Sequence, residues 1–135
     1  MSRQERERLL DAQKRAMDVL AAASAKAEQV KSEAEAEAVA LMLEEQKRAE
    51  SLIQQAQTEA TEHEHSEEEA RALLESHRTA ADVLSATEQT LAAKLSETKT
   101  NAAVDALMAG HREAAAILLD AWMQVAEGRP PAGER

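Results

Sequence analysis

The sequence predicts an all-α protein, an elongated helix that forms a coiled coil, and three observations indicate this fold. Aromatic residues make up 1% of the 135 residues, with one Trp and no Phe or Tyr, so the large side chains of an ordinary globular core are missing. Ala, Glu, Lys, Leu and Arg dominate, which is typical of long helices and coiled coils. No Gly precedes Gly110 and no Pro precedes Pro130, so no strong helix breaker interrupts residues 3–109.

Both ends of the helical region carry recognisable signals. Ser2 and Glu5 have the Ser-x-x-Glu spacing of a capping box, in which each side chain binds the backbone N–H of the other residue, so a helix should begin there. Gly128 stands where a helix C-terminal glycine is expected. The polar, Pro- and Gly-rich residues 128–135 are predicted to form a disordered tail.

Small and aliphatic side chains recur every eleven residues in residues 1–60, for example from Ala16 to Ala27. Eleven residues make three turns at about 3.67 residues per turn, which keeps an apolar stripe straight or produces a right-handed supercoil. Residues 70–127 repeat in the same way on other columns, so we expect two coiled-coil segments. The predicted oligomer-interface residues are Ala16, Val19, Ala27, Val30, Ala38, Leu41, Ala49, Leu52, Leu73, Ala81, Leu84, Ala92 and Leu95.

The stretch TEHEHSEEE, residues 61–69, separates the two sets of columns. The apolar stripe rotates there by roughly 100°. The helix could continue with an offset or a kink, or it could stop and restart as a folded-back hairpin. Ser66 and Glu69 have capping-box spacing, which favours a restart. Because Gly, Pro and Asn are absent, a tight turn is disfavoured, and we favour a continuous or kinked helix.

The most apolar part of the chain follows the weak point SETKTN at residues 96–101 and has the alternating three- and four-residue spacing of a heptad seam. This segment is either more of the same coiled coil or a separate C-terminal helix that docks on a partner. The residues predicted to dock the partner are Leu107, Leu118, Trp122 and Val125.

Histidines near residue 63 could act as a pH switch or as metal ligands. His63 continues the column of Val19, so a buried His63 would set register and respond to pH, because burial disfavours imidazolium; the alternative is an exposed His63. Glu59, Glu62 and His65 supply one Glu-x-x-His unit, whereas di-iron bundles use two such units and two further Glu. We therefore expect no metal site and no cofactor.

Charge and motif content disfavour several function classes. The net charge of −10 argues against nucleic acid and anionic lipid as partners, since both attract basic surfaces. No apolar run approaches the roughly 20 residues of a membrane span, and no signal-peptide pattern opens the chain, so we expect a cytoplasmic protein. A rod offers no pocket and no nucleophile motif occurs, so we expect no enzymatic activity and no small-molecule substrate.

Two families are similar to the first part of the chain. Residues 9–38, LLDAQKRAMDVLAAASAKAEQVKSEAEAEA, resemble the helical part of the DivIVA family, bacterial coiled-coil scaffolds of the cell pole and septum. The short membrane-binding domain of that family, with its exposed aromatic residues, has no counterpart here, so we expect no direct membrane targeting. The same Ala- and Glu-rich sequence also looks like the peripheral stalks of rotary ATPases, in which a long helical subunit pairs with another. The residues that match the DivIVA rods are Ala12, Gln13, Ala16, Asp18, Ala27 and Glu28.

The function expected from these patterns is structural. An apolar stripe on one long helix cannot bury itself, so the chain should self-associate, as a homodimer, and recruit partners as a non-enzymatic scaffold. The first alternative is a stalk subunit that pairs with a different long-helix protein. The second is a compact helical bundle that acts as a binding module or chaperone.

Overall fold

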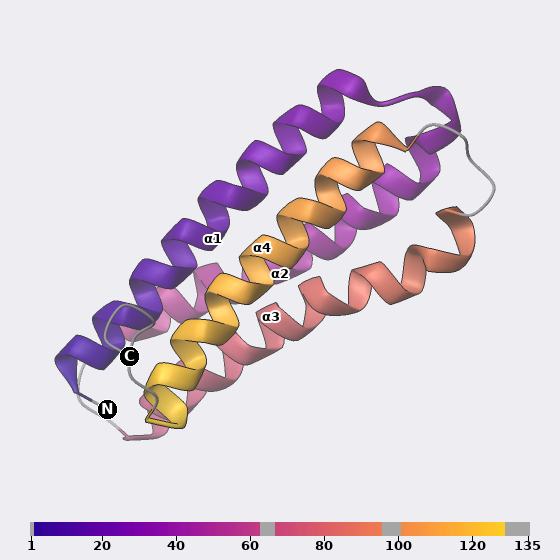
Figure 1. Ribbon diagram of the computed structural model, residues 1–135. Helices are drawn as coiled ribbons and strands as arrows, with labels where there is room; N and C mark the ends of the chain where they lie inside the picture. Colours follow the sequence, from indigo (N-terminus) through magenta and orange to yellow (C-terminus); the bar gives the residue numbers. More distant parts are fainter. Residues whose placement is uncertain (1, 63–66, 96–100, 129–135) are drawn as a thin grey trace.

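Four helices arranged as a bundle make up the described chain (Figure 1). The computed structural model describes residues 2–62, 67–95 and 101–128, and the side chains of these except at 59–62, 67, 69 and 87–95. No strand occurs within these residues, which confirms the all-α class. The elements are α1 (Arg3–Val30), a short 3₁₀ helix η1 (Glu33–Glu35), α2 (Ala36–Glu62), α3 (Glu67–Leu95) and α4 (Ala102–Ala126).

Successive helices run in opposite directions, so the chain folds back on itself three times (Figure 1). The most extensive helix contacts are those of α1 with α4, α2 with α3, and α3 with α4. The pairs α1–α3 and α2–α4 lie diagonally across the bundle. The longest helix has 29 residues and therefore extends about 45 Å. This packing corrects the expectation of one elongated helix, because the apolar stripes are buried against other helices of the same chain.

The first reversal follows α1 and was not predicted. The helix ends at Val30, and Ser32 precedes the next helical segment, with its N–H and its hydroxyl both donating to the Glu35 carboxylate and its backbone oxygen accepting from the Glu35 N–H. The backbone of Lys31 and Ser32 is extended, with ψ of 126° and 163°. A Ser-x-x-Glu sequence can thus end one helix and begin another without Gly or Pro, since it satisfies the first free N–H groups of the new helix.

The second and third reversals lie near the stretches TEHEHSEEE and SETKTN, which the sequence marked as points where the helical pattern changes. α2 ends at Glu62 and α3 begins at Glu67, so the expectation of a continuous helix through TEHEHSEEE is corrected in favour of the folded-back alternative. Residues 63–66, with His63, His65 and Ser66, lie outside the described residues. α3 ends at Leu95 and a separate helix, α4, starts at Ala102.

The predicted ends of the helical region are confirmed. Ser2 accepts a hydrogen bond from the Glu5 backbone N–H at 3.1 Å, and the Glu5 carboxylate accepts one from the Ser2 N–H at 2.9 Å. At the other end, Gly128 has a φ of 68°, which side-chain-bearing residues rarely adopt. It terminates α4 directly after Glu127, as a C-terminal glycine does.

The bundle core follows heptad spacing in all four helices. Buried positions alternate in steps of three and four, which is the pattern of left-handed helix packing in four-helix bundles. The eleven-residue repeat is not confirmed as the pattern of burial, since Val19 is half-buried and Val30 is exposed. The seam residues are Leu9, Gln13, Ala16, Leu20, Ala23 and Ala27 in α1; Val39, Met42, Gln46, Ala49, Ile53 and Ala56 in α2; Leu73, His77, Ala80 and Leu84 in α3; Val104, Leu107, His111, Ala114, Leu118 and Ala121 in α4.

Small residues bring α1 and α4 unusually close together. A Cβ atom added at Gly110 would overlap the Cβ atom of Ala23 and approach the backbone oxygen of Val19 to 3.8 Å. The glycine is therefore required by packing and not by its backbone conformation. Close approach compensates for the small area that each Ala side chain buries, because it increases dispersion contacts between the two backbones.

Candidate functional site

Two histidine–glutamine pairs cross the core and divide it into layers. The pair Gln13–His77 joins the diagonal helices α1 and α3, and the pair Gln46–His111 joins the diagonal helices α2 and α4. All four side chains are at most 3% exposed. The core has three apolar clusters, one in the middle of the bundle and one toward each end. Each histidine–glutamine pair lies between the middle cluster and one of the two end clusters. Polar residues at single seam positions favour one register of the helices, because other registers leave them unpaired.

His77 is hydrogen-bonded through both ring nitrogens. Its Nε2–H donates to the backbone oxygen of Leu118 at 2.6 Å, and its Nδ1 accepts from Nε2 of Gln13 at 3.0 Å. Both contacts are satisfied by the neutral ring with its proton on Nε2. Burial lowers the pKa of His77 from its ordinary value of 6.5 to about 4, although the bond to Leu118 acts in the opposite direction. The ring is thus neutral near pH 7.

His111 has one satisfied and one unsatisfied nitrogen. Its Nε2–H donates to Oε1 of Gln46 at 2.9 Å, while Nδ1 is buried without a partner among the described residues. The amide nitrogen of Gln46 donates to the Leu20 backbone oxygen, the Ser24 hydroxyl and the Glu50 carboxylate at 3.2, 2.6 and 3.0 Å. Burial lowers the pKa of His111 from 6.5 to about 4. The imidazole is therefore neutral in this layer as well.

A third buried polar group holds the start of α4. Glu35 is 1% exposed, and its Oε2 accepts hydrogen bonds from the backbone N–H groups of Ala103 and Val104 at 2.9 and 3.0 Å. Its Oε1 accepts from the N–H and the hydroxyl of Ser32 at 3.3 and 2.9 Å. Asn101 makes no side-chain capping bond itself, so Glu35 caps α4 from a distant part of the chain. Burial alone would raise the pKa of Glu35, but these hydrogen bonds outweigh it and lower that pKa.

A cavity of about 240 Å³ lies beside the Gln46–His111 layer. Its walls come from α2, α3 and α4, and its floor consists of buried side chains that include Met42, Leu84 and His111. Ser85 and Arg112 lie at the mouth, where both are exposed. An apolar cavity with a few polar groups at one side is the usual form of a small-ligand site. The sequence predicted no pocket, because three separate helices have to pack together to form this one.

The structure places most predicted interface residues in contacts within the chain. Ala16, Ala27, Ala49, Leu73, Ala81 and Leu84 are buried. Val19, Ala38, Leu41 and Leu52 are half-buried against the core clusters. Val30 is 40% exposed. The side chains of Ala92 and Leu95 lie outside the described set.

The residues predicted to dock a partner also pack within the bundle. Leu107 and Leu118 are fully buried, and Val125 and Trp122 are half-buried. The guanidinium carbon of Arg78 lies 4.8 Å from the centre of the Trp122 ring, which is close enough for a cation–π interaction.

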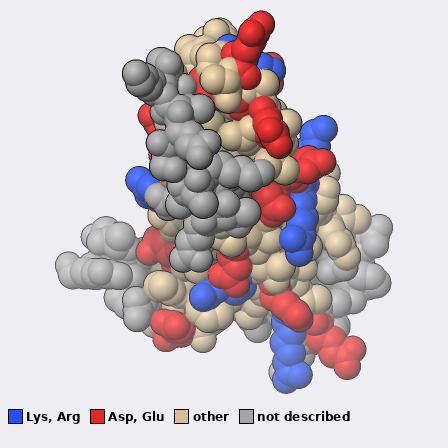
Figure 2. Space-filling model, turned by 90° about the vertical axis from the view of Figure 1, so that its right-hand side faces the viewer, with Lys and Arg blue, Asp and Glu red and all other residues tan. Residues whose placement is uncertain are grey.

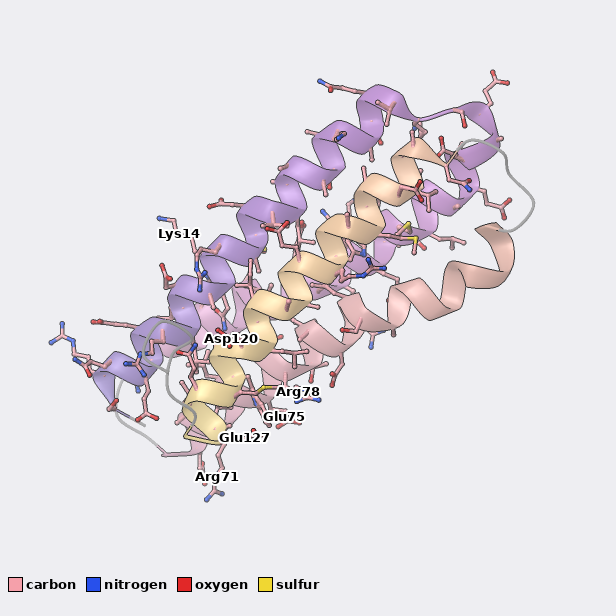
Figure 3. All side chains as sticks on the ribbon, viewed as in Figure 1. Lys14, Arg71, Glu75, Arg78, Asp120 and Glu127 are labelled. Carbon is pink, nitrogen blue, oxygen red and sulfur yellow. The ribbon has the colours of Figure 1, made fainter. Side chains whose placement is uncertain are left out.

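Charged side chains of both signs cover the outside of the helices. Figure 2 shows acidic and basic side chains interspersed on one face of the molecule. Lys14 on α1, and Arg71 and Glu75 on α3, are exposed and project outward (Figure 3). Arg78 forms an ion pair of 3.1 Å with Asp82. Such exposed pairs contribute little to stability, so the surface identifies no partner by charge alone.

In the described residues no three His, Cys, Asp or Glu side chains group as metal ligands. The Glu-x-x-His unit of Glu62 and His65, and the proposed switch residue His63, fall outside the described side chains. None of the helices, over their described length, is long and apolar enough to cross a membrane.

No protein-family model matches the chain, and no curated protein or solved structure shows significant similarity to it. The resemblances to DivIVA rods and to peripheral stalks therefore stay predictions.

The buried polar groups and the cavity were missed by sequence reasoning, although signals for some of them exist. His111 lies in the heptad seam of the C-terminal segment, and His77 lies four residues after Leu73 and seven before Leu84. A polar residue at a seam position of an apolar helix indicates a buried hydrogen bond. The partners of these histidines come from other helices, and no local pattern identifies them.

Proposed function

We propose that the chain is a non-enzymatic binding module, a compact helical bundle that takes its ligand at the cavity between α3 and α4. One observation carries the proposal. The cavity joins an apolar floor to exposed polar side chains at its mouth, and it is built by helices whose register is fixed by the buried Gln46–His111 pair.

The distribution of apolar side chains supports a compact module over a self-associating rod. Among the side chains that the structure describes, Val30 is the large hydrophobic residue that is exposed. Stable protein interfaces bury a contiguous apolar core. Most of the described residues that the sequence predicted to form such an interface pack α1 to α4 against one another instead.

Binding of a neutral apolar probe tests this proposal directly. Toluene should shift the amide NMR resonances of residues around the cavity and raise the melting temperature, because it binds the native state alone. Ala116→Leu, at the exposed mouth of the cavity, should weaken this binding. Ala25→Leu, an equal change at an exposed position of α1, should leave it unchanged. Resonance shifts that are absent, or that survive Ala116→Leu undiminished, would contradict the proposal.

The scaffold and stalk functions predict a different oligomeric state and a different degree of folding for the isolated chain. A scaffold should form a homo-oligomer alone, and a stalk subunit should fold poorly until another helical chain is added. Light scattering and circular dichroism on the isolated chain separate both from a folded monomeric module.

A further inference from the structure

The chemistry of the cavity mouth differs from that of its floor, and this difference specifies a ligand class. Building on the proposed binding function, we infer that the cavity between α3 and α4 binds a small organic carboxylate, with an apolar ring against the floor and the carboxylate held at the mouth by Arg112 and Ser85.

The floor suits one apolar ring. A cavity of about 150 Å³ lined by aliphatic side chains is enough to bind benzene. The cavity here measures about 240 Å³, so it can hold a ring with one or two further atoms. Met42 and Met108 contribute flexible, polarisable side chains that adapt to a flat ligand. The neighbouring His111 ring is buried and bonded to Gln46, so it adds a flat wall without a charge.

The mouth suits a carboxylate. Ser85 on α3 and Arg112 on α4 are exposed and line the same cavity from two different helices. The described residues that line it include no Asp or Glu. Arg112 already has an interaction within the chain, but a guanidinium carries five N–H donors and can serve a second acceptor. Arginine binds carboxylates through two parallel hydrogen bonds, which fixes the orientation of the ligand.

The charge of the whole chain makes this site distinctive. A net charge of −10 disfavours the approach of anions to the protein as a whole, so uptake of a carboxylate requires a specific cation. Among the described residues that line the cavity, Arg112 is the positively charged one, and the apolar floor supplies the rest of the binding free energy.

The experiment compares phenylacetate with phenylacetamide, its neutral counterpart of nearly the same shape, by calorimetry and amide NMR on the full chain. Phenylacetate should bind about tenfold more tightly or better, because charge-assisted hydrogen bonds are stronger than neutral ones. Arg112→Gln should abolish this preference and leave toluene binding unchanged. Arg15→Gln, which makes the same charge change on α1, should preserve it.

The outcomes separate this inference from the binding function on which it rests. Equal affinity for phenylacetate and phenylacetamide, with toluene bound, overturns the carboxylate specificity and leaves the module intact. A preference that persists in Arg112→Gln also overturns it. If neither toluene nor phenylacetate binds, the proposed function fails together with the inference. Circular dichroism of the Arg112→Gln variant establishes that the exposed substitution leaves the fold unchanged.

Discussion

Acidification should destabilise the bundle through its two buried histidines before most carboxylates titrate. His77 and His111 each have a pKa of about 4 in the folded chain, against an ordinary value of 6.5. Because the unfolded chain binds more protons between these two values, stability falls as pH falls through this window. Above about pH 6.5 the unfolded histidines are largely neutral too, and this contribution to stability is fully present.

The magnitude follows from the two pKa values. At about pH 5 an unfolded histidine is almost completely protonated, whereas the buried one is almost completely neutral. Linkage then gives a loss of about 2 kcal/mol for each histidine between about pH 7.5 and pH 5, or about 4 kcal/mol for both. Domains have total stabilities of about 5–15 kcal/mol, so this loss is a large fraction of the total.

Urea unfolding followed by far-UV circular dichroism, at several pH values across this window, measures the loss. His77→Gln supplies the control, because its amide can still donate toward the backbone oxygen of Leu118 and does not titrate. The variant should lose about 2 kcal/mol less than the wild type on acidification. The histidines outside the described residues are present in both proteins and cancel. Identical pH dependence in the two proteins would refute the burial of a neutral His77.

Further substitutions test the packing of the helices, each by urea or thermal unfolding. Gly110→Ala should destabilise the bundle by about 1–3 kcal/mol, because overlap with Ala23 outweighs the higher helix propensity of alanine; a stabilised variant would contradict the close approach of α1 and α4. Glu35→Gln should cost about 1.5–3 kcal/mol, since the charged cap of α4 is lost, and an unchanged midpoint would argue against that cap. Ile53→Ala should cost about 2–5 kcal/mol, whereas Val30→Ala should change stability by less than about 0.5 kcal/mol; equal effects would refute the assigned burial.

Local signals in the sequence were sufficient for the fold class and for both ends of the helical region. The all-α class follows from composition, and the caps at Ser2 and Gly128 follow from short patterns that need no distant partner. The register of the core was not recoverable in the same way. A heptad seam that steps by four, three and four also spans eleven residues, as from Leu9 to Leu20. The polar Gln13 lies in that seam between Leu9 and Ala16, so the seam is not a continuous run of apolar residues. The eleven-residue recurrence of apolar residues was therefore easier to recognise in the sequence than the heptad pattern.

The folded-back topology depended on contacts that no local pattern contains. The Ser32 capping box is present in the sequence, yet the carboxylate of Glu35 also caps α4, which begins far away along the chain. The choice between a rod and a bundle depends on such long-range contacts. The same apolar stripe can pack either against a second chain or against other helices of the same chain. The cavity has the same origin, since Met42, Leu84 and His111 belong to three different helices.

Small-angle X-ray scattering across a concentration series tests the central claim most directly, because it reports mass and maximum dimension together. A compact bundle predicts the mass of one chain, 14.7 kDa, and a maximum dimension of about 50–60 Å, since its longest helix extends about 45 Å. The mass should not change with concentration. An oligomer well over about 100 Å long would contradict the account, because a continuous helix of this chain would extend to roughly 180 Å.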